Sequence, residues 1–282
     1  MKYRHACHAG NFADVTKHVA LIALLLRLTH KPRPLFFLDT HAGRGRYDLT
    51  APQTAAEAKG GILRLAATPR ATLPALLARY LEIVNGPDAG ATARPQSYPG
   101  SPRIAAALLR VGDRAAFCEI EPAEAAALAR ELRGDRRLGV HCRDGFEALG
   151  ALLPPAEKRG LVLIDPPYED PAAELEHVAA ALVETARRWP QGVLAAWYPI
   201  KLASVAARFH RRLQAAGLER VLAAELCIHP DDSRASLNGS GLVIVNPPWQ
   251  LDADLRGAWP ALHALLAPDR AGRQGVRWLA GG

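Results

Sequence analysis

The chain has 282 residues, of which 49% are hydrophobic and 22% are charged. This composition is typical of a folded soluble protein and excludes a disordered or fibrous chain. Basic residues outnumber acidic ones by 35 to 28, and the resulting net charge of +7 favours an anionic partner such as nucleic acid. The longest apolar run, residues 19–26, is too short to cross a bilayer, so we expect a cytoplasmic protein with no membrane segment.

Apolar residues recur at helical spacing over residues 12–28, and Asn11 is a candidate N-cap for this helix. Seven apolar runs follow and are predicted to be strands: 35–38, 115–118, 138–142, 161–164, 193–197, 221–228 and 242–245. Helical stretches lie between most of them, at 104–111, 122–132, 172–189 and 202–216. This alternation predicts an α/β fold built on a mostly parallel sheet.

Two irregular connections define the expected architecture. About seventy residues separate the first two strands, far more than a simple βαβ unit needs, so residues 46–97 are predicted to be a helical insertion subdomain. Residues 229–240 show no helical pattern, and strands joined without a crossover helix pair antiparallel. We therefore predict one domain over 1–282, with a Rossmann-like sheet of seven strands whose last strand is reversed. This sheet is similar to that of class I methyltransferases, which use S-adenosylmethionine (SAM).

The motif with the clearest chemistry is Asp165-Pro166-Pro167-Tyr168, directly after the run 161–164. It resembles the motif of amino-group methyltransferases that act on adenine. A conjugated amine is a weak nucleophile, and its N–H groups need acceptors that orient the lone pair. Asp165 offers a carboxylate, and Pro166 lacks the N–H that would compete with a backbone carbonyl. We expect Tyr168 to stack on the base and Asp165 to assist proton loss after methyl transfer.

A similar motif, Asn246-Pro247-Pro248-Trp249, follows the last predicted strand. Ligands in open α/β sheets bind outside the carboxyl ends of the parallel strands. The reversed strand places its carboxyl end at the opposite edge. Asn246 is therefore predicted to lie far from the cofactor.

Candidate cofactor residues follow the first three predicted strands. Gly43 and Gly45 lie in the turn after Asp39 and allow close approach of a ligand to the backbone. Glu119 suits ribose hydroxyls, and Asp144-Gly145 suits an adenine ring. Each acid alone is more often a helix cap or a solvated side chain, but acids after three consecutive strands make a more specific pattern.

Further motifs extend along nearly the whole chain. They are Tyr3-Arg4-His5, His8-Ala9-Gly10-Asn11, Ala13-Asp14-Val15, Lys17-His18, Asp39-Thr40-His41-Ala42-Gly43, Tyr98-Pro99-Gly100-Ser101-Pro102 and Trp197-Tyr198-Pro199. Together with the two Pro-Pro motifs, they resemble the bacterial 23S ribosomal RNA adenine-N6 methyltransferases of the RlmJ type.

The resemblance implies a SAM site, catalysis at Asp165 and substrate contact by Tyr3. The predicted SAM-binding residues are Lys17, His18, His41, Gly43, Ser101, Glu119, Asp144 and Gly145. His5 is added to the substrate site, and residues 1–11 are predicted to form a lid over the RNA base. The expected partner is 23S rRNA, protein-free or at an early stage of assembly, and the protein is expected to be monomeric. His5, Cys7 and His8 lack a fourth ligand at zinc spacing, so no metal is expected.

Other functions remain open at this point. The same fold could methylate guanine N2 or DNA adenine N6. A protein-glutamine enzyme usually has Asn in place of Asp165, which counts against that acceptor. A non-enzymatic RNA-binding factor is disfavoured by the retained Asp165, Glu119 and Asp144. A nicotinamide dehydrogenase is disfavoured because the third glycine of its fingerprint would fall at Asp48.

Overall fold

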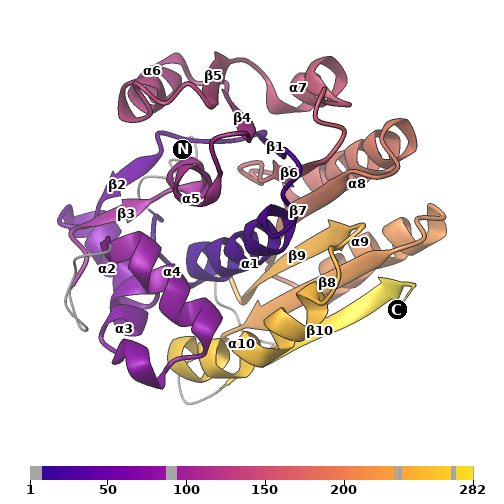
Figure 1. Cartoon of the computed structure of the whole chain (residues 1–282). Coiled ribbons are helices and arrows are strands. Elements are labelled where there is room, and N and C mark those ends of the chain that lie inside the picture. The colour runs from indigo at the N-terminus through magenta and orange to yellow at the C-terminus, as the bar shows by residue number, and fades with distance from the viewer. Residues whose placement is uncertain (1–7, 87–93, 232, 234–236, 268–270, 282) are drawn as a thin grey trace.

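Helices cover both faces of a central eight-stranded sheet in the computed structural model of the chain (Figure 1). The structure describes residues 8–86, 94–231, 233, 237–267 and 271–281. The strand order from edge to edge is β10-β8-β9-β7-β6-β1-β4-β5. These strands are β1 (Phe36–Asp39), β4 (Arg114–Glu119), β5 (Leu138–Cys142), β6 (Gly160–Ile164), β7 (Val193–Ile200), β8 (Val221–Cys227), β9 (Gly239–Val245) and β10 (Arg273–Ala280).

The direction of the strands confirms the predicted methyltransferase-type sheet. β5, β4, β1, β6 and β7 are mutually parallel, whereas β9 is antiparallel to both β7 and β8. The reversed seventh strand is therefore confirmed. An eighth strand, β10, pairs antiparallel with β8 and was not predicted. Its Arg, Gln and Gly residues give no continuous apolar run, so its pairing with β8 was not visible in the sequence.

The helices form two layers, one on each face of the sheet. One layer contains α1 (Phe12–Thr29), α5 (Ser101–Leu108), α6 (Pro122–Glu131) and α10 (Leu251–Leu266). The other contains α7 (Gly145–Leu152), α8 (Pro171–Arg188) and α9 (Ala203–Ala215). None of the helices in the described residues is long and apolar enough to cross a membrane.

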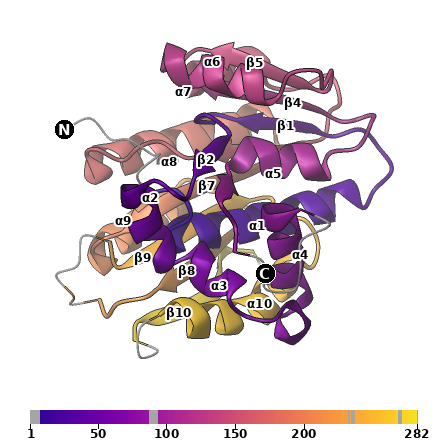
Figure 2. The same ribbon diagram turned by 90° about the vertical axis from the view of Figure 1, so that its left-hand side faces the viewer.

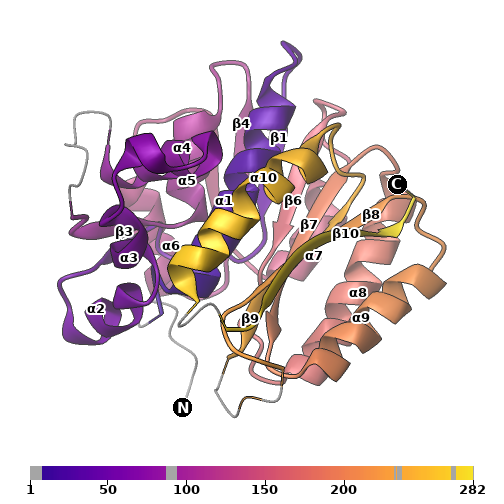
Figure 3. The same cartoon turned by 90° about the horizontal axis from the view of Figure 1, so that it is seen from below.

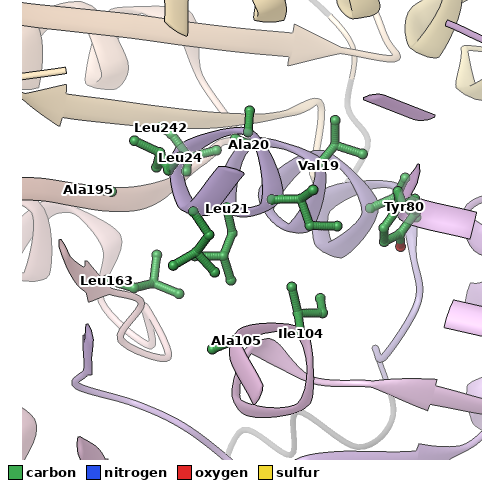
Figure 4. Packing of buried hydrophobic residues seen from close by; sticks show 14 of the residues in the cluster. Val19, Ala20, Leu21, Leu24, Tyr80, Ile104, Ala105, Leu163, Ala195 and Leu242 are labelled. Atoms are coloured by element: carbon green, nitrogen blue, oxygen red, sulfur yellow. The ribbon is translucent and has the colours of Figure 1, made fainter. Parts of the chain in front are cut away.

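The central helix of the first layer is α1, which is buried along most of its length. As predicted, Asn11 caps it by accepting hydrogen bonds from the backbone N–H groups of Ala13 and Asp14. Figure 4 shows α1 between the sheet and its neighbouring helix α5, with Leu21 beside Leu163 of β6. This packing holds Lys17 of α1 next to the segment that follows β6.

The segment between β1 and β4 contains short helices and a two-stranded sheet. Its elements are β2 (Arg46–Asp48), α2 (Pro52–Lys59), α3 (Ile62–Ala66), a 3-10 turn (Arg70–Thr72), α4 (Ala75–Asn85) and β3 (Ser97–Pro99). Figures 1 and 2 place α2–α4 beside α1 and α10, and their apolar residues share one core with those helices. The Ile62 N–H donates a 2.8 Å hydrogen bond to the Gly10 carbonyl, so this segment is attached to the start of α1.

Candidate active site

Acidic side chains meet where the parallel strands end. Asp39 closes β1 and pairs in register with Phe117 of β4 and Leu163 of β6. Glu119 is two residues beyond Phe117, and Asp165 is two residues beyond Leu163. Asn246 follows β9, whose last residue pairs with Leu194 near the start of β7. The second Pro-Pro motif is therefore at the opposite edge of the sheet.

Asp165 is held by a buried lysine. Nζ of Lys17 lies 2.6 Å from Oδ2 of Asp165 and 2.8 Å from Oδ1 of Asp14. Burial alone would lower the pKa of Lys17, but the two carboxylates hold it well above its ordinary value. The ammonium group is therefore charged and orients Asp165. Among the described residues, no donor is bonded to Oδ1 of Asp165, so this oxygen can accept a hydrogen bond from a substrate.

An aromatic wall lies next to this ion pair. The ring of Trp197 is 5.7 Å from Nζ of Lys17, and its indole N–H donates a 2.8 Å hydrogen bond to Ser240. Tyr168, with φ +53°, packs edge-on against Trp197 and donates its hydroxyl hydrogen to the Trp197 carbonyl. Tyr168 is only 5% exposed, so its ring is covered by protein. Stacking of Tyr168 on a base would require this aromatic pair to rearrange.

The buried carboxyl of Asp39 ends β1, which lies between β6, followed by Asp165, and β4, which ends in Glu119. The pKa of Asp39 is raised to about 7, mainly by burial, with the nearby Ser101 hydroxyl opposing the shift and the charge of Asp165 adding to it. Oδ1 accepts the backbone N–H of His41 at 3.2 Å. Oδ2 is buried, and no described donor reaches it with hydrogen-bonding geometry. Asp39 therefore has an unused acceptor inside the predicted cofactor site.

The glycine turn after β1 closes against the end of β4. The Gly43 N–H donates to Oε2 of Glu119 at 2.9 Å, and the Glu121 N–H donates to Oε1 at 2.8 Å. Gly43 has φ +61°, and a Cβ there would lie 2.2 Å from the Tyr47 hydroxyl. A larger residue would therefore both strain the turn and clash. The half-buried Glu119 carboxylate keeps lone pairs that can face a ligand.

Asp144 and Gly145 connect the end of β5 to the turn after β1. Oδ1 of Asp144 caps α7 by accepting the N–H groups of Phe146 at 2.7 Å and Glu147 at 3.0 Å. A Cβ on Gly145 would lie 2.0 Å from the Thr40 carbonyl oxygen, so the start of α7 packs directly on the backbone of the β1 turn. This contact brings Asp144 close to the other acids.

His41 completes this side of the site. Burial lowers its pKa to about 4, so the ring is neutral at pH 7. The Thr40 hydroxyl donates to the Leu163 carbonyl and lies 2.7 Å from Nδ1 of His41. Nδ1 is then the donor to Thr40, and Nε2 is free to accept a hydrogen bond. The His41 ring meets the edge of Phe146 at 5.3 Å.

The structure brings most of the predicted residues together, with one exception among those it describes. His18 is 1% exposed, and its Nδ1 lies 2.7 Å from the Tyr98 hydroxyl, which in turn lies 2.8 Å from that of Tyr80 in α4. His18 therefore lies behind the site, within the core that joins α1 to the insertion. Tyr3 and His5 lie outside the described residues.

Sequence reasoning had not assigned Asp14, Trp197 or Phe146 to the site. The spacing of Asp14 and Lys17 by three residues on one helix face is a signal for the first of these. Trp197 and Phe146 are brought to the site only by the packing of the tertiary structure. Among the described residues, no group of three or more His, Cys, Asp or Glu side chains is arranged to hold a metal ion.

Comparisons with known proteins show the family of this chain. The family model described as Ribosomal RNA large subunit methyltransferase D, RlmJ, matches residues 32–280. The proteins named Ribosomal RNA large subunit methyltransferase J in Haemophilus influenzae and Escherichia coli K12 are each 38% identical over 99% of both chains. A crystal structure of a Legionella pneumophila protein superposes with a TM-score of 0.85 at 34% identity, covering 97% of this chain and 98% of that one. The chain therefore belongs to the RlmJ family of ribosomal RNA large subunit methyltransferases.

Proposed function

We propose that the protein transfers a methyl group from SAM to N6 of one adenine in 23S rRNA. The observation that carries this proposal is the position of Asp165. It follows β6, is held by Lys17 at 2.6 Å, and precedes two prolines that lack N–H donors. The two curated relatives, whose names specify ribosomal RNA of the large subunit, support RNA as the substrate.

The residues at the strand ends fit SAM. Glu119 can accept hydrogen bonds from two ribose hydroxyls, and Asp144 keeps Oδ2 for an adenine amine while Oδ1 caps α7. The buried Oδ2 of Asp39 needs a donor, and the ammonium group of an amino acid would supply one. Lys17, by contrast, contacts Asp165, so we propose that it positions the catalytic carboxylate instead of binding cofactor. Bound SAM supplies a methyl group activated by a positive sulfonium.

Asp165 is proposed to orient the target amine. Its free Oδ1 accepts one N–H hydrogen bond, which turns the nitrogen lone pair towards the methyl donor. Once the amine has taken the methyl group, with the sulfonium sulfur as the leaving group, it would lose one proton, and the Asp165 carboxylate would accept it. This step needs no strong base, since the amine becomes strongly acidic once alkylated.

The remaining substrate contacts are proposals from the family motifs. Tyr3 and His5 would contact the extruded base, with residues 1–11 acting as a lid. We further propose that the enzyme works as a monomer in the cytoplasm, on rRNA that is protein-free or at an early stage of assembly. Its net charge of +7 supports binding to RNA phosphates.

The test is to incubate the protein with SAM and protein-free 23S rRNA and to analyse the digested nucleosides by mass spectrometry. We expect N6-methyladenosine with the wild type and none with Asp165→Asn. Methylguanosine, or methylation of DNA or protein but not RNA, would contradict the proposal.

A further inference from the structure

The edge of the sheet opposite the active site is rich in basic residues. Parallel strands begin at the same edge, and four of them are preceded or opened by cations. Lys158 and Arg159 precede β6, Lys31 and Arg33 precede β1, Arg114 opens β4, and Arg136 and Arg137 precede β5. In Figure 3 the connection between α1 and β1 and the first turn of α10 both lie towards the top, at this edge.

Hydrogen bonds hold the central part of this edge in one shape. Arg110 donates to the carbonyls of Thr29, Lys31 and Arg33 at 2.6–2.9 Å. Arg159 donates to the carbonyls of Leu28 at 3.0 Å and Arg33 at 2.9 Å. Carbonyl groups do not neutralise a guanidinium. Burial, followed by the positive charges of Arg110 and Arg33, lowers the pKa of Arg159, which shows how closely the cations are packed.

Positive charge at this edge exceeds the available carboxylates. Asp113, Glu157 and Asp135 are each already paired with an arginine of the edge. Four exposed cations, Lys31, Arg33, Arg136 and Lys158, form no ion pair with any described residue. A hollow of about 410 Å³ is lined by Arg114, Arg136 and Arg137 at the starts of β4 and β5, and by the end of α7 with the residues that follow it. The edge can therefore bind several anionic groups.

An exposed tryptophan joins the same edge. Trp249 is 77% exposed and follows β9, the reversed strand, so its carboxyl end lies where the parallel strands begin. The neighbouring Gln250 accepts a 2.9 Å hydrogen bond from Arg27, which precedes the Leu28 carbonyl bound by Arg159. Trp249 is therefore connected through adjacent residues to the clasped loop before β1. A flat, exposed aromatic ring on the same edge as unpaired cations suits a nucleic acid, because the ring stacks on bases while cations bind phosphates.

We infer that Lys31, Arg33, Arg136, Lys158 and Trp249 form a second RNA-binding surface, the basic edge, which holds single-stranded RNA flanking the target. This inference rests on RNA being the substrate. The two edges are separated by strands of five or six residues, or about 17–20 Å. A minimal hairpin in the active site would not engage the basic edge, whereas the same hairpin with single-stranded extensions would.

The experiment compares a minimal hairpin containing the target adenine with the same hairpin extended at both ends. Lys31→Glu/Arg33→Glu is the test variant, and Arg208→Glu/Arg211→Glu on the exposed face of α9 is the control with the same change in net charge. We expect the test variant to raise the Kd for extended RNA about ten-fold or more and to reduce the slope of log K against log salt by about 1.4. The Kd and turnover for the minimal hairpin should stay within about two-fold of wild type.

Trp249 gives a second, optical readout. Extended RNA should quench tryptophan fluorescence more than the minimal hairpin does, and Trp249→Phe should abolish that difference. Trp249→Ala should weaken binding of extended RNA about five-fold or more. The inference would be overturned if the test variants bound extended RNA as tightly as the wild type, or if the α9 control lost as much affinity as they do. The basic edge would then serve a partner other than RNA. Absence of RNA methylation by the wild type would instead overturn the proposed function.

Discussion

The ammonium nitrogen of Lys17 lies 2.6 Å from Oδ2 of Asp165, although the two residues are 148 positions apart in the chain. Lys17 also pairs with Asp14 one turn earlier on α1. The central helix thus carries a cation, held by its own carboxylate, to the end of β6. Because α1 is packed into the core, the role we propose for Asp165 would make catalysis depend on the position of a buried helix.

Replacing Lys17 with Met should leave two carboxylates without their cation. We expect a loss of about 3–5 kcal/mol in the free energy of unfolding, measured with urea, together with a loss of turnover. The double variant Asp14→Asn/Lys17→Met removes one of the two stranded charges and should regain part of the stability. It should not regain turnover, because Asp165 still lacks its partner. Recovery of both would show that Lys17 has only a structural role.

The two Pro-Pro motifs form a matched pair for mutation. Asp165→Asn should lower turnover by about a hundred-fold or more while SAM affinity, measured by calorimetry, changes little. Asn246 donates to the carbonyls of Pro190 and Gly192 at 2.7 and 2.9 Å, so Asn246→Ala should cost about 1–2 kcal/mol of stability and leave turnover intact. Loss of turnover in Asn246→Ala, with normal turnover in Asp165→Asn, would instead place the catalytic site at the edge that carries Asn246.

Glu119→Ala should weaken SAM binding about ten- to a hundred-fold, because a charged acceptor for ribose hydroxyls is lost. Glu184→Ala is a suitable control, since this exposed carboxylate lies near the end of α8, which precedes β7 and is therefore at the opposite ends of the parallel strands. Isothermal titration of both variants with SAM separates the two positions. Equal affinities would remove Glu119 from the cofactor site.

Two glycines of α7 should respond in opposite ways to alanine. A Cβ on Gly145 would lie 2.0 Å from the Thr40 carbonyl, so Gly145→Ala should destabilise the protein by about 1–3 kcal/mol and weaken SAM binding by displacing Asp144. The nearest atom to a Cβ on Gly150 is 3.8 Å away, so Gly150→Ala should be neutral or stabilising by up to about 1 kcal/mol. Urea unfolding of both variants tests this contrast. Similar stabilities would argue against close packing on the β1 turn.

The buried His210 should make stability depend on pH. Burial lowers its pKa to about 4, although Glu225 favours the charged form, and Nε2 lies 2.7 Å from the Tyr198 hydroxyl. In the unfolded chain His210 becomes protonated below about pH 6.5, whereas in the folded protein it stays neutral down to about pH 4. The free energy of unfolding therefore falls as pH drops through this range.

The effect of His210 can be isolated with His210→Gln. The buried His41 also lowers the stability of the protein as pH falls. Asp39, with a pKa of about 7, has the opposite effect, since its contribution to stability is lost as pH rises from about 4 to 7. The comparison with wild type cancels both of these contributions. Between pH 7 and pH 4 the variant should lose up to about 3 kcal/mol less than wild type. Parallel pH profiles would mean that His210 is not held neutral.

The sequence alone predicted seven of the sheet's eight strands and the reversal of β9, which puts Asn246 and Asp165 at opposite edges. Both followed from local signals, namely apolar runs, the missing helix before β9 and polar residues placed directly after strands. The register of β1 with β4 and β6 confirmed where the acids meet. Strand β10 escaped prediction because its stability comes from pairing with β8 and not from its own composition.

Only the tertiary structure decided how neighbouring residues divide their roles. Lys17 and His18 are adjacent in sequence and were assigned together to the cofactor, yet one side chain contacts Asp165 and the other is buried against Tyr98. The basic edge was likewise invisible, because its cations precede strands that are far apart in the chain. Helix rotation and strand direction set which side chains converge. Both are settled by packing between distant segments, which no local pattern of residues specifies.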